Sequence, residues 1–385
     1  MSKVDVYITA TSAVLPNKAV TNDEIENVLG MVQGKPSRAK RIVLKQNGIK
    51  ERYYVLDPET GQPVFTNAQL TASAILKLFQ NNEELDSIGC LSCGTTMADQ
   101  LAPNHAVMVH GELKNLHCEV SASSGICMSG IAALKYAWMS VKCGEHNKAV
   151  STGSETSSVM LRAEKFFHPE KHTPEELEKQ PELSFEKDFL RWMLSDGAGA
   201  FLVENSPTQR SNQPVLRIEW IKMLSFANEL ETCMYALAEK EEDGNLRSWT
   251  DFETHELIKR SVLTIQQDVR LLNKNIVEVV LIKALKEITE KTSLDINEID
   301  FFLPHISSMY FYNKVDKALT ENGFHIPQEK WFTNLTRCGN TGSASIYIML
   351  DELLKSGKVK SGQKILCFVP ESGRFSSSFM LLTAV

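Results

Sequence analysis

The sequence alternates short apolar runs rich in β-branched residues with longer stretches of helical periodicity, and this alternation restricts the fold more than any other feature. The runs that we expect to form strands are 6–9, 87–92, 149–152, 200–203, 299–303 and 364–369. The stretches that we expect to form helices are 67–81, 103–113, 130–142, 255–273, 276–289 and 343–356. Strands that alternate with helices of this length are typical of mainly parallel sheets covered by helices. The pattern therefore predicts an α/β fold.

The same alternation occurs on both sides of a boundary near residues 205–215. A chain of 385 residues is long enough for two packed units of ~200 residues each. We therefore expect an N-terminal unit, 1–205, and a C-terminal unit, 206–385. The segment 162–191 interrupts the alternation, because it is highly charged and contains three prolines. It is either an inserted lid or partner-facing excursion, or a plain solvated loop.

The composition excludes several classes of protein and of partner. With 43% hydrophobic residues and a net charge of −7, the chain is not of the disordered type. The negative charge argues against nucleic acid or an anionic membrane as the main partner, because both favour a broad basic surface. No apolar run approaches the ~20 residues of a membrane helix, and we expect no signal peptide. The eight scattered cysteines indicate reduced thiols in a cytoplasmic protein.

One cysteine, Cys127, lies in a pattern suited to a nucleophile. A strand-like segment and small residues precede it, and a helix-like stretch with apolar residues at 131, 134, 138 and 141 follows it. At such a strand-to-helix turn the helix dipole stabilises a thiolate and lowers the Cys pKa. Free backbone N–H groups at the same turn can hold a developing oxyanion. The local pattern fits a buried cysteine in a packing contact equally well.

Two polar side chains follow other predicted elements. His305 ends the apolar run 299–304, and open α/β sheets bind ligands at the carboxyl ends of their strands. Asn340 lies between Gly339 and Thr341, just before a predicted helix. Taken singly, His305 fits a structural histidine and Asn340 fits a turn residue. Together with Cys127 they would form a nucleophile with two polar side chains converging on one pocket.

These motifs, taken together, resemble the ketoacyl synthase III family of condensing enzymes over nearly the whole chain. The matching segments are 7–16, 20–22, 48–52, 153–155, 196–200, 304–305 and 339–341, and Cys127 stands where the family has its active cysteine. The resemblance implies a thiolase-like fold, in which two similar βαβαβαββ halves form a layered αβαβα core. It also implies a homodimer and no metal or organic cofactor.

The resemblance implies a reaction in two steps. Cys127 accepts the acyl group of a thioester. A second thioester, of malonyl or β-ketoacyl type and bound to acyl carrier protein or coenzyme A, then attacks it. His305 and Asn340 would stabilise the enolate of that second substrate by hydrogen bonds. The backbone N–H groups of Cys127 and Gly373 would hold the tetrahedral oxyanion.

The chain departs from the family at three places that bear on the substrate. Residues 306–308 are Ile-Ser-Ser where the family has Gln-Ala-Asn, and only Gly373 is left of a glycine-rich run. Ile42 and Gln46 stand where the family stacks the adenine of coenzyme A between Trp and Arg. These changes favour a carrier-bound substrate and an enzyme of specialised metabolism of the dialkylresorcinol or cyclohexanedione type. The competing functions are 3-oxoacyl carrier-protein synthase III of fatty-acid initiation, an acyltransferase to an alcohol or amine, and a non-catalytic scaffold.

A basic cluster lies near the substituted adenine position. Its members are Lys35, Arg38, Lys40, Arg41, Lys45, Lys50 and Arg52. In a chain of net charge −7, five of them (Arg38, Lys40, Arg41, Lys45 and Arg52) are candidates to dock an acidic carrier protein and its phosphopantetheine. A merely solvated basic face is the alternative. Glu155 is likewise either a base that reaches the site or a structural residue.

Overall fold

The computed structural model describes residues 4–37, 40–166, 189–292 and 294–385. Its strands are β1 (Tyr7–Val14), β2 (Val20–Thr21), β3 (Glu51–Arg52), β4 (Cys90–Thr95), β5 (Glu119–Ser124), β6 (Lys148–Glu155), β7 (Gly197–Glu204), β8 (Leu216–Ser225), β9 (Met234–Tyr235), β10 (Ala238–Lys240), β11 (Leu246–Ser248), β12 (Gln266–Gln267), β13 (Phe301–Pro304), β14 (Lys364–Glu371) and β15 (Ser376–Ala384). Its α-helices are α1 (Ile25–Leu29), α2 (Lys40–Asn47), α3 (Asn67–Leu76), α4 (Asn82–Asp86), α5 (His105–Leu113), α6 (Ser129–Lys142), α8 (Thr254–Lys259), α9 (Val269–Asn275), α10 (Ala284–Thr292), α11 (Tyr312–Glu321), α12 (Leu335–Cys338) and α13 (Ser345–Lys355). A π-helix, η7 (Ile276–Lys283), joins α9 to α10. The short 3-10 turns are η1 (Val32–Gly34), η2 (Ser157–Met160), η3 (Ala163–Lys165), η5 (Phe189–Trp192), η6 (Trp249–Asp251), η8 (Ile296–Glu298), η9 (Met309–Phe311), η10 (Gln328–Lys330) and η11 (Gly342–Ala344).

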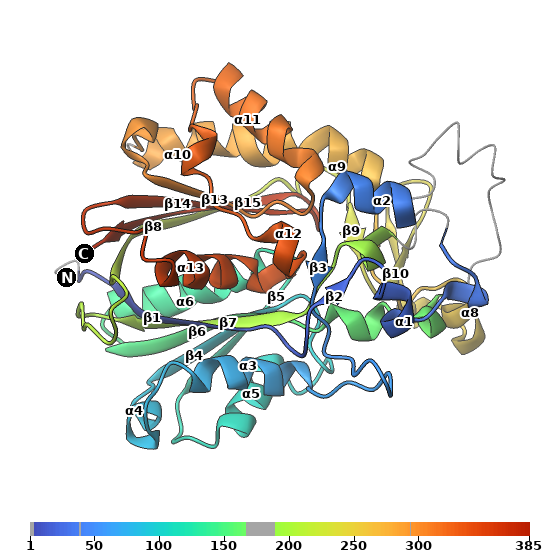
Figure 1. The fold of residues 1–385 in the computed structure, drawn as a ribbon, viewed down its shortest axis with the longest axis horizontal. Helices are drawn as coiled ribbons and strands as arrows, with labels where there is room; N and C mark the ends of the chain where they lie inside the picture. Colours follow the sequence, from blue (N-terminus) through green and yellow to red (C-terminus); the bar gives the residue numbers. More distant parts are fainter. Residues whose placement is uncertain (1–3, 38–39, 167–188, 293) are drawn as a thin grey trace.

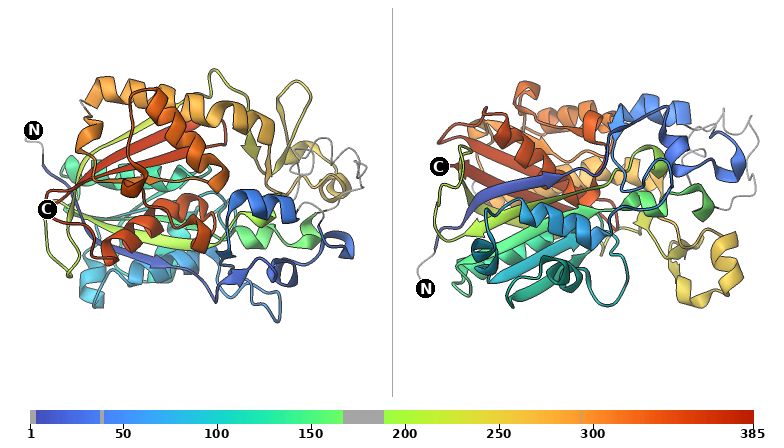
Figure 2. Two further views of the ribbon diagram at one scale, coloured as in Figure 1. Left: turned by 45° about the horizontal axis from the view of Figure 1, so that its top comes forward. Right: turned by 60° about the horizontal axis from the view of Figure 1, so that its bottom comes forward.

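The main sheet has the strand order β13-β14-β15-β8-β1-β7-β6-β4-β5. The sheet has two parts, β13-β14-β15-β8 and β1-β7-β6-β4-β5. They are joined where β8 pairs with β1, through Tyr7 with Arg217 and Ile8 with Leu216. The parts stack on each other with α6 and α13 between them (Figure 1). Helices α3 and α5 cover one outer face, and α10 and α11 cover the other, as the further views in Figure 2 also show. The expected αβαβα layering is therefore confirmed.

The first half follows the expected βαβαβαββ order, from β1 through α3, β4, α5, β5, α6 and β6 to β7. In the second half, the strand expected after α11 is reduced to one parallel bridge between Phe302 and Trp331. The expectation of mainly parallel sheets is wrong. β1 pairs antiparallel with β7, and β8 pairs antiparallel with β15, because the last strand of each half returns beside the first.

The prediction of one continuous helix over 255–273 is also wrong, because the middle of this segment is not helical. Helix α8 ends at Lys259, and α9 begins only at Val269. Between them β12 pairs with β9, which draws the chain into an extended conformation. The side chain of Asp268 accepts from the backbone N–H of Leu271 at 2.9 Å and so caps the new helix.

Two glycines bring the predicted site segments together in the central layer. A Cβ atom on Gly130, at the start of α6, would lie 2.3 Å from the carbonyl oxygen of Ser343. A Cβ atom on Gly153, in β6, would lie 2.2 Å from the same oxygen. Only glycine permits this approach. As a result, the turn before α13, which follows Asn340, packs directly against the start of the helix that follows Cys127.

The division of the chain at residue 205 stays a prediction. The greater part of the segment 162–191 lies outside the described residues, so the choice between lid and loop stays open. Among the helices of the described ranges, none has the length and apolar character needed to cross a membrane.

Candidate active site

Cys127 lies in the turn between β5 and α6, as the sequence pattern predicts. Burial, and after it the carboxylates of Glu155 and Glu371, raise the pKa of the Cys127 thiol. The predicted lowering of this pKa is therefore wrong for the resting protein. The thiol is protonated at neutral pH, and its proton has to leave when the acyl group arrives.

His305 follows β13 directly, and only 3% of its surface is exposed. Its backbone N–H donates to the carbonyl of Phe368 at 2.8 Å, which holds the residue at the end of the sheet. Burial lowers the pKa of the imidazole to about 4. The ring is therefore neutral at physiological pH, with one nitrogen that donates and one that accepts.

Asn340 is held by its backbone on two sides. Its N–H donates to the carbonyl of Met193, and its carbonyl accepts from Ser195, each at 2.9 Å. The side-chain oxygen Oδ1 accepts from the backbone N–H of Gly342 at 3.0 Å. Because Oδ1 is used in this way, the amide turns its NH₂ group, a donor, toward the space in front of it.

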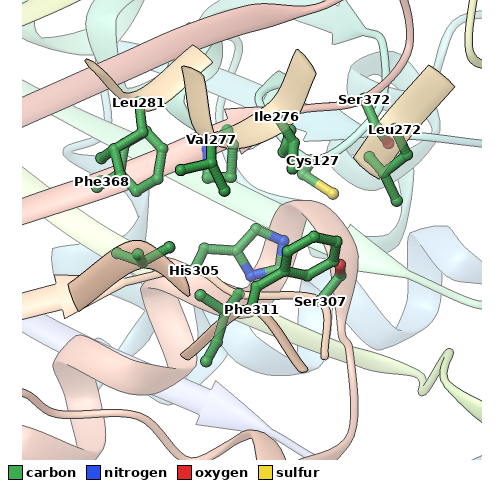
Figure 3. A pocket seen from close by; sticks show the side chains of 13 residues that line it. Cys127, Leu272, Ile276, Val277, Leu281, His305, Ser307, Phe311, Phe368 and Ser372 are labelled. Carbon is green, nitrogen blue, oxygen red and sulfur yellow. The ribbon is translucent and has the colours of Figure 1, made fainter. Parts of the chain in front are cut away.

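Two cavities meet at Cys127. The inner cavity, about 40 Å³ in volume, is lined by Cys127 and His305 among others. Figure 3 shows the Cys127 sulfur and the His305 ring facing this space. The side cavity, of about 30 Å³, is lined by Cys127, Asn340 and Glu155. Ser307 lines both cavities. The structure thus brings the three predicted side chains to the walls of two adjoining spaces that share the cysteine.

A larger cavity, the entrance, leads from these spaces to the surface. It measures about 270 Å³ and shares Leu272, Ser307 and Phe311 with the inner cavity. Gln46 and Tyr310 line the entrance and are exposed. The shared residues place the entrance between the surface and the spaces at Cys127.

Gly373 lies against the residue before the candidate nucleophile. A Cβ atom on Gly373 would lie 3.0 Å from the Ile126 side chain and 3.0 Å from the carboxylate of Glu371. The carbonyl of Gly373 accepts from the backbone of Cys233 and Met234 at 2.8 and 3.1 Å, which fixes the loop. The oxyanion role of Gly373 stays a prediction.

The structure places the members of the basic cluster in different environments, some exposed, one paired with a carboxylate and one buried. Arg41 and Lys45 are exposed on α2, the helix that also lines the entrance. Lys40 is paired with Glu26 at 3.0 Å. Arg52 is wrongly included in the docking surface, because it is fully buried and donates to the carbonyl of Trp192 at 3.2 Å. Arg38 lies outside the described residues.

Glu155 is tied into the fold. Its Oε1 accepts from the backbone N–H of Ser343 at 3.0 Å and from that of Thr96 at 3.2 Å. Burial raises its pKa to about 6. These bonds join the ends of β4 and β6 to the turn before α13, which supports a structural role.

Sequence reasoning missed Glu371. Its carboxylate accepts from the backbone N–H groups of Ile126 and Met128, the two neighbours of Cys127, and burial raises its pKa. The signal available in the sequence is a carboxylate inside the run that should supply the oxyanion loop. Because Cys127 and Glu371 lie far apart in the sequence, their proximity could not be predicted from it.

Comparisons with known proteins show what the chain is similar to. Residues 289–379 match the family model described as 3-oxoacyl-(acyl-carrier-protein) synthase III C terminal. The β-ketoacyl-(acyl-carrier-protein) synthase III of Aquifex aeolicus is 24% identical over 361 residues, 93% of this chain and 93% of that protein. That of Xanthomonas campestris pv. campestris is 22% identical over 363 residues, 93% of this chain and 92% of that protein.

Solved structures show the same fold. OleA of Xanthomonas campestris, with bound lauric acid and lauroyl-CoA, superimposes with a TM-score of 0.73 at 19% identity, covering 98% of this chain and 99% of that one. AbyA1, a tetronic acid condensing enzyme, has a TM-score of 0.72 at 16% identity and covers 98% of this chain and 100% of its own.

Proposed function

We propose that this chain, a ketoacyl synthase III-like member of the thiolase superfamily, is a ketosynthase that joins two acyl thioesters by a carbon–carbon bond. One observation carries the proposal. Cys127 borders both the cavity lined by His305 and the cavity lined by Asn340. A nucleophile and two hydrogen-bonding side chains therefore converge on one place, as acyl transfer followed by enolate attack requires.

In the first step the Cys127 sulfur attacks the carbonyl of an acyl thioester. The bond from that carbonyl to the donor sulfur breaks, and the proton of the Cys127 thiol leaves with the released donor thiol. Cys127 then carries the acyl group as a thioester. The backbone N–H groups of Cys127 and Gly373 are proposed to hold the oxyanion formed on the way.

In the second step His305 and the Asn340 NH₂ group donate to the thioester oxygen of a second substrate. A neutral imidazole suits this role, because it donates without bringing a charge into a buried site. The enolate carbon attacks the acyl-Cys127 carbonyl, and the bond to the Cys127 sulfur breaks. With a malonyl-type substrate carbon dioxide leaves as the enolate forms, and the released Cys127 thiolate takes a proton from solvent. With a β-ketoacyl substrate the α-proton passes to solvent as the enolate forms, and a proton from solvent then restores the thiol.

We assign the enzyme to the dialkylresorcinol or cyclohexanedione-forming type, with a β-ketoacyl second substrate, in specialised metabolism. Gln46 lines the entrance at the position where the resemblance would place an arginine beside the adenine of coenzyme A, so a carrier-bound substrate is favoured. A carrier protein docking on α2, a homodimer and a cytoplasmic location belong to the same proposal. The names of the curated relatives favour a second candidate, the synthase that initiates fatty-acid synthesis on acyl carrier protein.

Intact-protein mass spectrometry after incubation with acyl thioesters tests the proposal. We expect a stable acyl mass on Cys127 from carrier-protein donors. Product mass then separates the candidates, because a malonyl donor releases carbon dioxide, and transfer to an alcohol or amine yields an ester or amide. Absence of any adduct with both coenzyme A and carrier-protein donors would refute a condensing enzyme.

A further inference from the structure

Glu155 ends β6, and its side chain lines the side cavity together with Cys127 and Asn340. Only 2% of its surface is exposed. Among the described residues that line this cavity, it is the one ionisable side chain apart from the Cys127 thiol. In the second step the sulfur of Cys127 carries the acyl group and cannot take a proton. The carboxylate of Glu155 is then the proton acceptor in the wall of this space.

The hydrogen bonds of Glu155 are concentrated on one of its two oxygens. Oε1 accepts from the backbone N–H of Ser343 at 3.0 Å, from that of Thr96 at 3.2 Å and from the Thr96 hydroxyl at 2.5 Å. Three donors on Oε1 leave Oε2 as the oxygen that can act as a base. The same bonds hold the carboxylate in place, so a structural role of Oε1 and a chemical role of Oε2 are compatible.

The condensation itself fixes where the reacting carbon of the second substrate lies. This α-carbon attacks the acyl-Cys127 carbonyl, so it has to lie beside the sulfur. The thioester oxygen next to it accepts from Asn340 in the proposed second step. Cys127, Asn340 and Glu155 line one cavity of about 30 Å³. A base has to lie within hydrogen-bond reach of the proton that it removes, and a carboxylate in the wall of so small a space meets this condition.

The environment of Glu155 makes it a better base than an exposed glutamate. Burial raises its pKa to about 6, which leaves it mostly ionised at neutral pH. The titratable groups that its charge acts on are both acids, Cys127 and Asp196, and the pKa of Asp196 is raised to about 7. His305 is a weaker base, because burial lowers the pKa of its imidazole to about 4.

The charge of Glu155 also separates the two kinds of second substrate. A malonyl-type substrate brings a carboxylate of its own, and no lysine or arginine is among the described residues that line the side cavity. The two negative charges would repel each other with no compensating cation. A β-ketoacyl thioester is uncharged and needs a base, whereas loss of carbon dioxide forms the enolate without one.

We propose that Glu155 is the catalytic base of the second step and removes the α-proton of a β-ketoacyl thioester. The bond between the α-carbon and this hydrogen breaks, its electron pair stays on the substrate as the enolate, and the proton binds Oε2. After the enolate has attacked acyl-Cys127, the carboxyl group releases the proton to solvent. The proposal rests on the condensing function proposed above.

The test follows the second step in an enzyme that is already loaded. Acyl-Cys127 is quantified by intact mass, a β-ketoacyl pantetheine thioester is added, and product is measured in a single turnover across about pH 5 to 8. Glu155→Gln keeps an oxygen for the donors at Oε1 but cannot take a proton. Glu155→Asp keeps the carboxylate on a shorter side chain. Asp351→Asn is the matched control, because Asp351 is a buried carboxylate on α13 that does not line the cavities at Cys127.

In the wild-type enzyme the rate of condensation should rise with pH through the pKa of Glu155, near 6, and level off above it, because only the ionised carboxylate takes a proton. Glu155→Gln should load like the wild type, condense about a hundredfold more slowly or worse, and lose this pH dependence. Glu155→Asp should recover part of the rate together with the pH dependence. Asp351→Asn should behave as the wild type.

Three results would overturn the proposal. The first is a Glu155→Gln enzyme that condenses at the wild-type rate, and the second is one that keeps the pH dependence. The third is an equal fall of loading and condensation in both Glu155 variants, which would identify a purely structural residue. Failure of the wild-type enzyme to load at all would instead refute the condensing function.

Discussion

At the scale of single residues, Cys127 is surrounded by groups that oppose the ionisation of its thiol. Its local pattern, a turn of small residues before a helix, favours a thiolate. Burial and two carboxylates act in the opposite direction and raise its pKa. One of them, Glu371, also binds the backbone on both sides of the cysteine. Glu371 therefore has two effects: it binds the backbone of the turn, and its charge adds to the rise that burial and Glu155 cause in the pKa of the thiol.

Replacing Glu371 by Gln tests this electrostatic effect. The amide keeps one acceptor for the backbone N–H groups but removes the negative charge, so the pKa of Cys127 should fall. The pH profile of Cys127 alkylation by iodoacetamide should then shift to lower pH. Glu112→Gln, at an exposed carboxylate on α5, is the control and should not change the profile. A Glu371→Gln profile that coincides with the wild type would exclude an electrostatic role.

Cys127 is proposed to act in both steps and His305 only in the second, and this difference gives a second prediction. Cys127→Ala should abolish both acylation and condensation. His305→Ala should retain acylation and lose condensation by about a hundredfold or more, because a donor to the enolate oxygen is removed. Intact mass reports the first step and product formation the second. Acylation of His305→Ala as weak as that of Cys127→Ala would contradict the assignment.

At the scale of helices and strands, close contacts between elements place the site. Helix α6 and strand β6 both approach the turn before α13 at glycines, and this contact puts Cys127 near Asn340. The helix expected at 276–289 is present, but its first residues wind as a π-helix. Apolar periodicity predicts a helix there and does not distinguish its winding, which depends on packing against β14 and α11.

Gly130→Ala tests the close contact. The added methyl group would meet a backbone oxygen, which cannot move aside without shifting the turn before α13. We expect the free energy of unfolding to fall by about 1–3 kcal/mol and the rate of Cys127 acylation to fall with it. Urea denaturation measures the first effect and intact mass the second.

Gly111→Ala is the matched control, since it also lies in a helix and its methyl group would meet no atom within 4 Å. It should raise the free energy of unfolding by up to about 1 kcal/mol, because alanine favours the helix. Equal effects of the two substitutions would contradict the packing argument.

At the scale of the whole molecule, a net charge of −7 makes the exposed basic side chains of α2 a local exception. Arg41 and Lys45 lie on the helix whose other residues line the entrance. An acidic carrier protein bound there would have its pantetheine arm directly above the path to Cys127. Exposed charges of this kind mainly raise the rate at which the two proteins associate, and salt screens this effect.

Charge reversal tests this docking surface. Arg41→Glu combined with Lys45→Glu should raise KM for a carrier-bound acyl donor about tenfold at low salt, and less at high salt. The same variant should keep its KM for the free acyl-pantetheine thioester. Lys358→Glu, at an exposed position after α13, is the control. An equal loss with both donors would argue against docking on α2.

The layered arrangement was implied by the resemblance to the ketoacyl synthase III family. The residue pattern by itself determined the α/β class, the turn that carries Cys127 and the strand end that carries His305. These features depend on local periodicity and on residue types within a short window. Only the tertiary structure decided that Arg52 is buried, that Glu371 reaches the neighbours of Cys127 and that η7 lines a cavity. Burial and Coulomb interactions depend on residues far apart in the chain, and no short pattern contains them.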